Sequence, residues 1–483
     1  MKRENSDTSI WKREYHLPGT ARLKAAFARV PDTAAGWMAF LCISVYLLLP
    51  AAICVLAVVR CQIDVTYFYY HHIFEYYVYP YTSWVLAAAM VLRAFQLRRT
   101  GLRAASFFRQ PVVMLFLYLT AWMTASTLVN GTNYTVRYGT ASLGETFYTQ
   151  LSYFVLLFPA ALLIREDRLK TALLRLFMLV SLLLALSAFY LWPRQAESVF
   201  IMGWRPAFTC IFINTNYYGY FLTVAASLAA AMFCVERTKL WKAVSTLCLM
   251  ANTAALSYNN TMGAWVGSFF ACLFLVIAYR IRDGRFNRDA IISLTVFLAV
   301  MIGAGLYNGK LLRNISQLFD DIGYIVLQPG SQKALNAGSH RWRIWIEVLK
   351  QIKSHPLFGI GFVGVFHREL ESIVRNNRPH NEYLQYALFY GIPAGIAYFG
   401  GCLSIFIHAL RRKTDLNSLH VAALTAAFGY LVGGFFGLTL FNTTPYLFFM
   451  LGLGYVDMHG QIQKRSEQPC LTPLTSPGGA SDD

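Results

Sequence analysis

Long apolar runs recur along this chain, separated by short loops rich in Arg and Lys. Apolar residues make up 56% of the sequence and charged residues 14%, a balance that excludes an ordinary soluble enzyme of this length. A helix of about 20 apolar residues is long enough to cross a bilayer. The sequence therefore predicts an all-α polytopic membrane protein with about 12 transmembrane helices, near residues 37–59, 81–97, 111–129, 147–164, 171–192, 213–234, 239–257, 262–279, 290–307, 384–409, 419–438 and 442–458.

The basic residues indicate how these helices are oriented. The formal net charge is +18, but Lys and Arg form short clusters between spans, not the continuous patch that would favour nucleic acid as a partner. The clusters fall in every second loop, as expected for the cytoplasmic side. They are Arg98/Arg99/Arg103/Arg109, Arg165/Arg168/Lys170, Arg237/Lys239/Lys242, Arg280/Arg282/Arg285/Arg288 and Arg411/Arg412/Lys413. We therefore expect both termini to be cytoplasmic.

This orientation divides the chain into five parts. Residues 1–36 form a cytoplasmic tail, 37–307 the first nine spans, 308–383 a long extracytoplasmic loop between spans 9 and 10, 384–458 the last three spans, and 459–483 a second cytoplasmic tail. The second tail is rich in small and polar residues and is expected to be disordered. The long loop is itself basic, but long loops translocate largely regardless of charge.

The cysteines give no sign of a metal site. Most of the nine Cys residues lie inside apolar runs, and none forms a CxxC or Cys/His pattern. Such cysteines behave as small apolar side chains. We expect neither a structural metal nor a cofactor.

The polar chemistry is concentrated in the long loop. From Ser339 to Ser354 apolar residues recur at helical spacing, which predicts an amphipathic helix that could lie on the outer leaflet. Arg341 and Arg343 on this helix either solvate it or bind a phosphate-bearing head group, for which the forked guanidinium is suited. His355-Pro356 ends the helix, because Pro disfavours helical geometry in the residue before it.

His380 and Asn381 precede an apolar helix expected to begin near Tyr383. A histidine at a helix entrance is either a cap or interface residue, or a catalytic group. Its position beside Arg378 and the basic loop favours the catalytic interpretation.

Several of these residues resemble motifs of the O-antigen ligase and polymerase family. The similar features are Arg341 and Trp345 as R-x3-W, residues 355–361 as HPLxGxG, His380-Asn381 separated by nine residues from Gly391, Arg205 followed by Asn214, Asn216, Tyr217 and Gly219, and Thr444-Pro445-Tyr446. One feature departs from the family. Where members commonly have Ser-Arg-Gly, this chain reads Thr261-Met262-Gly263, so Met262 replaces an expected cation.

The resemblance implies a GT-C-like enzyme of the bacterial cytoplasmic (inner) membrane. Family members move a glycan from an undecaprenyl-diphosphate carrier to an acceptor hydroxyl on the outer side of that membrane, without a nucleotide sugar or a metal. By this resemblance, Arg205 and Arg341 hold the diphosphate and His380 is the base. Four further substrate-binding candidates are Arg343, Arg378, Asn214 and Asn216, and Asn381 orients the base or the acceptor.

The resemblance leaves the acceptor open. Ligases of the family tend to carry His-Asn at this position and some polymerases carry Arg, which favours a ligase-like reaction. The same pair occurs in exopolysaccharide polymerases and protein O-oligosaccharyltransferases. The expected partners are therefore the carrier-linked glycan, a glycan or lipid acceptor, and membrane lipids.

Two readings compete with a transferase. About 12 spans alone suggest a secondary transporter, although transporters usually place ionisable residues at mid-membrane. A non-catalytic scaffold for polysaccharide assembly would tolerate replacement of His380 and the Arg residues.

Overall fold

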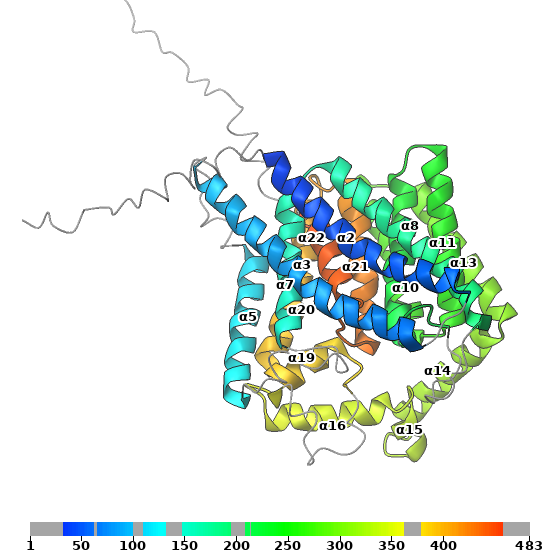
Figure 1. Ribbon diagram of the computed structural model, residues 1–483. Helices are drawn as coiled ribbons and strands as arrows, with labels where there is room; N and C mark the ends of the chain where they lie inside the picture. The colour runs from blue at the N-terminus through cyan, green and yellow to red at the C-terminus, as the bar shows by residue number, and fades with distance from the viewer. Residues whose placement is uncertain are drawn as a thin grey trace, which may run out of the picture.

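The chain is built from helices throughout the part that the structure describes. The computed structural model describes residues 32–61, 65–99, 110–131, 147–194, 208–212, 214–361 and 378–456, and every regular element in these ranges is helical. In chain order (Figure 1) they are α2 (Asp32–Val59), α3 (Val65–Arg99), α5 (Pro111–Asn130), α7 (Phe147–Leu163), α8 (Asp167–Leu191), η2 (Trp192–Arg194), α10 (Thr215–Val235), α11 (Lys239–Asn259), α12 (Met262–Asp283), α13 (Arg288–Tyr307), α14 (Lys310–Leu327), α15 (Gln332–Asn336), α16 (Arg341–Ser354), α19 (Glu382–Tyr390), α20 (Ile392–Arg411), α21 (Ser418–Gly433), η3 (Gly434–Phe436) and α22 (Thr444–Gly454).

Eight segments among the described residues are long and apolar enough to cross a membrane. They are Ala34–Val59, Pro111–Asn130, Asp167–Arg194, Thr215–Val235, Met262–Asp283, Arg288–Tyr307, Ile392–Arg411 and Ser418–Phe436. This finding supports a polytopic membrane protein and gives a smaller number of spans than the sequence predicted.

The other expected spans are helical but are shorter or more polar. α7 has 17 residues and α22 has 11, whereas a perpendicular span needs about 20. α11 has 21 residues but carries several polar side chains that bond inside the bundle. One of these is Asn252, whose Nδ2 donates to Ser181 Oγ at 3.1 Å.

The predicted single span over 384–409 is wrong, because the helix breaks at Gly391. Gly391 has φ +91° and separates α19 from α20, and Pro393 lies in the first turn of α20. A left-handed residue followed closely by proline cannot continue an α-helix. α19 is therefore a separate short helix of 9 residues.

Helices α10, α12 and α21 form the centre of the bundle. The apolar window of α10 is 83% buried and that of α21 is 78% buried. A Cβ added to Gly267 of α12 would lie 2.5 Å from the backbone oxygen of Gly429 on α21. Small residues at such crossings let membrane helices approach closely, so these glycines set the tight packing behind the site described below.

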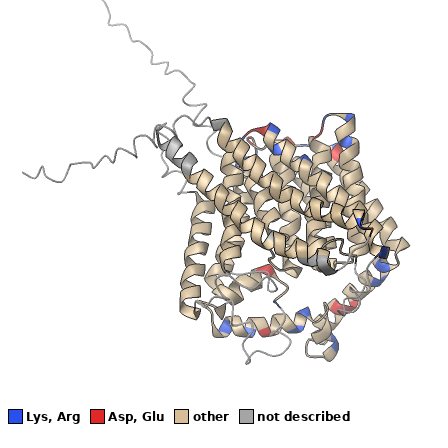
Figure 2. Cartoon of the chain, in the orientation of Figure 1, with Lys and Arg blue, Asp and Glu red and all other residues tan. Residues whose placement is uncertain are grey.

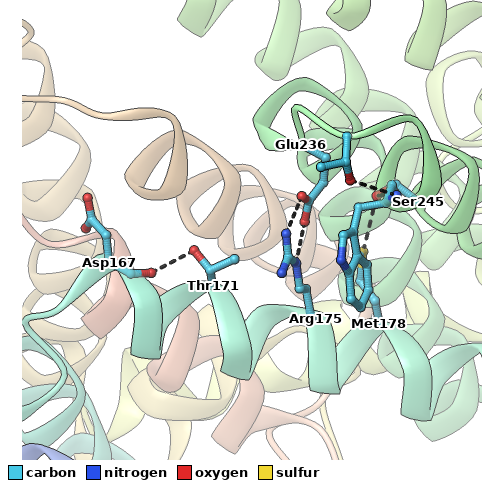
Figure 3. Close-up of polar contacts among 8 residues, drawn as sticks. Asp167, Thr171, Arg175, Met178, Glu236 and Ser245 are labelled. Carbon is cyan, nitrogen blue, oxygen red and sulfur yellow. Dashed lines mark hydrogen bonds and ion pairs between the residues drawn. The ribbon is translucent and has the colours of Figure 1, made fainter.

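Among the residues that the structure describes, charged positions gather at the two ends of the bundle (Figure 2). At one end Arg175 of α8 makes a two-pronged ion pair with Glu236, at 2.7 and 2.6 Å (Figure 3). The guanidinium also lies 4.1 Å from the centroid of the Trp241 ring. These contacts join the start of α8 to the connection between α10 and α11. Charges at the ends and apolar surface between them are what a bilayer requires.

The opposite end carries α14, α15, α16 and α19 (Figure 1). The predicted helix over 339–354 is confirmed as α16, and it ends before His355 as expected. Its apolar residues Ile344, Val348 and Ile352 are buried in the core of the protein. These apolar residues of α16 are therefore covered by the protein itself and not by lipid, and the suggested position on the outer leaflet stays a prediction.

The break at Gly391 yields a stability prediction. A Cβ at Gly391 would lie 1.8 Å from the Leu357 backbone oxygen. We expect Gly391→Ala to reduce the free energy of unfolding by about 2–5 kcal/mol, because left-handed geometry costs an L-residue about 1–2 kcal/mol and overpacking about 1–3 kcal/mol. Thermal unfolding in detergent measures the loss. Gly303→Ala is the control, since its Cβ would meet nothing within 4 Å. Equal stability of the two variants would contradict the prediction.

Candidate active site

The site begins with the short segment from Arg378 to Asn381, which lies between α16 and the chain that follows η3. Arg378 Nη1 donates to the Thr439 backbone oxygen at 3.0 Å. Trp345 Nε1 of α16 donates to the Pro379 backbone oxygen at 2.9 Å. The segment is thus attached through two consecutive residues, Arg378 and Pro379, and His380 follows them directly in the chain.

His380 has an unusual backbone and an unusual side chain. Its φ is +50°, a left-handed conformation that costs energy in a residue with a Cβ and is often found at functional sites. Its Nδ1 is closed off from solvent and has no hydrogen-bond partner in the described structure. Burial, followed by the positive charges of Arg341 and Arg378, lowers the pKa of His380 to about 4. The imidazole is therefore neutral near pH 7 and has an unused ring nitrogen.

Arg341 is the first residue of α16 and is half-buried. It lies close enough to His380 to lower its pKa, and it is also within electrostatic range of the Tyr220 hydroxyl. Arg343 follows two residues later on the same helix and points to another side, since successive residues turn by about 100°. Arg341 and Arg378 are thus the two arginines that the structure brings to His380.

Asn381 caps α19. Its Oδ1 accepts hydrogen bonds from the backbone N–H groups of Tyr383 and Leu384, both at 3.0 Å. Asn is among the preferred N-cap residues because its side chain satisfies N–H groups that the first turn leaves unpaired. The expected helix near Tyr383 is therefore confirmed, and the described contacts of Asn381 are those of a cap that holds His380 at the helix entrance.

Asn214 caps α10 in a similar way. Its Oδ1 accepts from the backbone N–H of Asn216 at 2.8 Å. Asn214 is exposed and Asn216 is half-buried. The third predicted residue of this region, Arg205, lies outside the described residues.

Two residues of the site were not predicted from the sequence. Glu382 is buried at 1% exposure, and its carboxylate accepts hydrogen bonds from Tyr398 at 2.8 Å and Tyr430 at 2.7 Å. Tyr220 of α10 is also buried, has no partner for its hydroxyl among the described residues, and is within electrostatic range of Arg341 and Glu382. The signal for Glu382 was available, because an acidic residue at the start of an apolar helix is a functional candidate by default. Tyr220 had no such signal among the 29 tyrosines.

The HPLFGIG segment, residues 355–361, supports the site and is held by backbone contacts. The N–H of Ile392 donates to the Pro356 oxygen at 2.8 Å, and the N–H of Ile360 donates to the Leu388 oxygen at 2.9 Å. A Cβ at Gly359 would lie 2.4 Å from that same Leu388 oxygen. The glycine is needed here because a neighbouring backbone occupies the space of a side chain.

The α5 helix completes this attachment. Trp122 Nε1 donates to the backbone oxygens of Leu357 at 3.0 Å and Tyr390 at 3.1 Å, and its ring stacks on Phe358 with centroids 5.3 Å apart. Ser126 Oγ donates to the Phe358 oxygen at 2.6 Å. The segment thus joins α5 to the break between α19 and α20.

Met262 is the first residue of α12 and stands where the family pattern has an arginine. It is half-buried and packs against the apolar core. The next residue, Gly263, lies against Tyr220, whose hydroxyl is 2.9 Å from the position of an added Cβ. The start of α12 is therefore next to Tyr220 and contributes no charge at this position.

In the described part of the chain, no three His, Cys, Asp or Glu side chains cluster where a metal could bind. The polar groups that the site does offer are a neutral imidazole, two guanidinium groups, a buried carboxylate and a buried phenol. The imidazole can accept a proton, and the guanidinium groups can bind an oxyanion such as a phosphate.

The capping role of Asn381 can be tested by substitution. Asn381→Ala removes the acceptor of two N–H groups, and we expect it to lower the free energy of unfolding by about 0.5–2 kcal/mol. Asn381→Ser keeps a capping oxygen and is expected to retain most of that stability. Thermal unfolding in detergent compares the two, and equal losses in both variants would contradict the capping role.

The family comparison covers this site. Residues 246–399 match the family model described as O-antigen ligase, a segment that includes Arg341, Arg378, His380 and Glu382 but not Asn214 or Arg205. No curated protein sequence matches the chain. The family match agrees with the all-helical, apolar structure. This match supports an assignment to the O-antigen ligase/polymerase family.

Proposed function

We propose that this protein transfers a glycan from an undecaprenyl-diphosphate carrier to the hydroxyl group of an acceptor. The observation that carries the proposal is the unpartnered Nδ1 of His380 beside the charges of Arg341 and Arg378. Transfer of this kind needs a base for the acceptor hydroxyl and cations for the diphosphate leaving group. This site supplies both.

The reaction proceeds in one displacement. The imidazole of His380 takes the proton of the acceptor hydroxyl while the hydroxyl oxygen bonds to C1 of the donor sugar. The bond between C1 and the diphosphate oxygen breaks, and undecaprenyl diphosphate leaves with the bonding electrons. Arg341 and Arg378 stabilise the negative charge that develops on the diphosphate. The imidazolium then returns its proton to water.

The same arginines control the strength of the base. In the substrate-free site they lower the pKa of His380 together with burial, so the imidazole is neutral but weakly basic. A diphosphate bound to Arg341 and Arg378 places negative charge beside the ring and offsets this effect. The base therefore becomes stronger when the donor is in place.

We assign the role of base to His380 and not to Glu382. Both carboxylate oxygens of Glu382 already accept hydrogen bonds from tyrosines, whereas Nδ1 of His380 has no partner among the described residues. We assign Glu382 a positioning role at the start of α19. Arg205, Arg343, Asn214 and Asn216 remain candidates for donor binding on the strength of the family resemblance.

We place the α16 end of the bundle on the outer side of the cytoplasmic membrane. Arg237, Arg282 and Lys413 line one pocket together with Asp167 and Glu236, at the end of the bundle opposite α16, where Figure 2 colours Lys and Arg positions in the connections between helices. Short cytoplasmic connections carry such an excess of basic residues. Carrier-linked glycans would then reach His380 from the outer leaflet. The proposed reaction uses the side chains named above and needs no metal ion.

A ligase-like reaction is the preferred form of this proposal, and a polymerase of the same family is the alternative. The His380-Asn381 pair supports the first, through the family pattern described above. A multi-span secondary transporter is the remaining alternative. Transporters also contain interrupted helices, so the break between α19 and α20 is compatible with this alternative. It predicts substrate flux into proteoliposomes without release of undecaprenyl diphosphate.

The role of His380 is tested by His380→Ala. We expect the rate of glycan transfer to fall by roughly 10² to 10⁴, because the variant lacks the general base. The measurement uses purified protein with a lipid-diphosphate oligosaccharide and, separately, lipid A core, a second carrier-linked glycan and a pilin-like protein. It follows released undecaprenyl diphosphate and the product mass, which also identifies the acceptor class.

The matched control is His355→Ala, whose imidazole is exposed at the end of α16. This variant should transfer glycan at close to the rate of the unsubstituted protein. Near-normal transfer by His380→Ala, at equal amounts of folded protein, would show that another group is the base.

The electrostatic control of His380 predicts a pH dependence. A positive neighbour disfavours the imidazolium, so Arg341→Gln should raise the pKa of His380 from about 4 towards its ordinary value of 6.5. In the unsubstituted protein kcat/KM should stay level from pH 8 down to about 5, because kcat/KM reports the free enzyme. In Arg341→Gln, kcat/KM should begin to fall at a higher pH than in the unsubstituted protein. It should also be lower at every pH.

The dependence of kcat on pH provides a second reading. Because kcat reports the donor-bound enzyme, its fall should begin at a higher pH than that of kcat/KM in the unsubstituted protein. Two outcomes would together contradict the coupling of His380 to Arg341 and to the bound donor. One is that kcat and kcat/KM of the unsubstituted protein fall at the same pH. The other is that Arg341→Gln has the same pH profiles as the unsubstituted protein.

A further inference from the structure

Helix α14 carries an apolar stripe that the protein does not cover. Leu312, Ile315, Phe319, Ile322 and Val326 recur at intervals of three and four residues, so they share one face of the helix. All five are exposed, from 40% for Ile315 to 70% for Val326. A stripe of this length on a water-exposed surface would be unfavourable.

The protein packs against a different side of α14, and the polar contacts of the helix lie on that side. The one buried residue of the helix is Asn314, whose Nδ2 donates to Asn260 Oδ1 at 2.6 Å. Asp321 lies close to the same side and accepts from the backbone N–H of Gly338 at 2.9 Å. In a helix packed onto a soluble core the apolar face would point inward. Here it points elsewhere, so its natural environment is outside the protein.

The start of α14 is fixed where a membrane span ends. α13 has 20 residues, which gives a length of about 30 Å, the thickness of the hydrocarbon core. Only 28% of its apolar window is buried in the protein, so most of α13 faces lipid. It ends at Tyr307, which is 86% exposed, and tyrosines are enriched at the membrane interface.

The turn between α13 and α14 is attached to the bundle. Asn308 Nδ2 donates to Ser257 Oγ at 3.1 Å, and Lys310 Nζ donates to the Tyr258 oxygen at 2.6 Å. Gly309 supplies the left-handed residue of the turn, with φ +67°. The exposed apolar surface thus passes from α13 into the α14 stripe across a turn that holds α14 at the level of the interface.

We propose that α14 is an interfacial helix whose apolar stripe is embedded in the head-group region of the bilayer. The ligand of this surface is the lipid bilayer itself. Its polar flank, with Ser316, Gln317 and Asp320, then faces water. Through Asp321 and Gly338 the embedded helix also sets the height of α16, which begins three residues later at Arg341. The proposal concerns membrane contact and does not depend on glycan transfer.

The test replaces single residues of the full chain with the photoreactive p-benzoylphenylalanine, in nanodiscs of phosphatidylethanolamine and phosphatidylglycerol. Phe319 represents the stripe and Gln317, which is exposed on the polar flank, is its matched control. Ile302 on the lipid-facing side of α13 shows that the label reacts with lipid. After illumination, mass spectrometry identifies what each position has bonded to.

We expect lipid adducts at positions 302 and 319 and none at position 317. Adducts between two copies of the chain at position 319 would show that the stripe is a dimer interface and would overturn the proposal. So would the absence of lipid adducts at position 319 while position 302 reacts, or equal lipid adducts at 317 and 319. Because the readout is a covalent adduct, a failure of the proposed transferase activity leaves this test intact.

Discussion

The break between α19 and α20 imposes the constraint on which the site depends. A helix that ends inside an apolar environment leaves backbone groups without partners, and each of these costs several kcal/mol unless the protein satisfies it. Here the HPLFGIG segment and α5 supply the partners, through the pairs Ile392–Pro356 and Ile360–Leu388 and the Trp122 side chain. The break in turn makes α19 a separate short helix, so its N-cap Asn381 and the preceding His380 can lie at the entrance of the bundle instead of within a long span.

Glu382 holds the other side of this short helix. A carboxylate buried away from water is unfavourable unless donors surround it, and its donors come from α20 through Tyr398 and from α21 through Tyr430. Tyr430 also lies 2.8 Å from Thr444 at the start of α22. One carboxylate therefore connects four helices directly behind His380. This arrangement helps to maintain the left-handed backbone of His380, a conformation that surrounding contacts must enforce.

The sequence predicted the helical membrane class, the α16 helix and the helix start at Asn381, because each depends on local patterns such as apolar periodicity and capping chemistry. It also identified Arg341, Arg378 and His380, which the structure brings together. It did not predict the break at Gly391, although Gly391 and Pro393 are a local signal for a helix end; the close contact with the Leu357 backbone, which makes the glycine necessary, is visible only in the tertiary structure. For the same reason the sequence suggested a lipid contact for α16. Its apolar periodicity shows that one face is covered, but not whether protein or lipid covers it. The roles of Arg341, Arg378 and His380, and those of Arg343, Asn214 and Asn216, stay predictions.

The absence of a cation at Met262 bears on the balance between donor binding and base strength. Each guanidinium near the diphosphate site adds attraction for phosphate, but it also disfavours protonation of His380, as Arg341 and Arg378 already do. Gly263 places the start of α12 against Tyr220, which is within electrostatic range of Arg341. A third positive charge there would lower the pKa of the base further in the empty site. In the proposed reaction, the uncharged side chains of Met262 and Tyr220 would leave fewer cations to bind the donor and an imidazole that a single bound diphosphate could make basic enough to act.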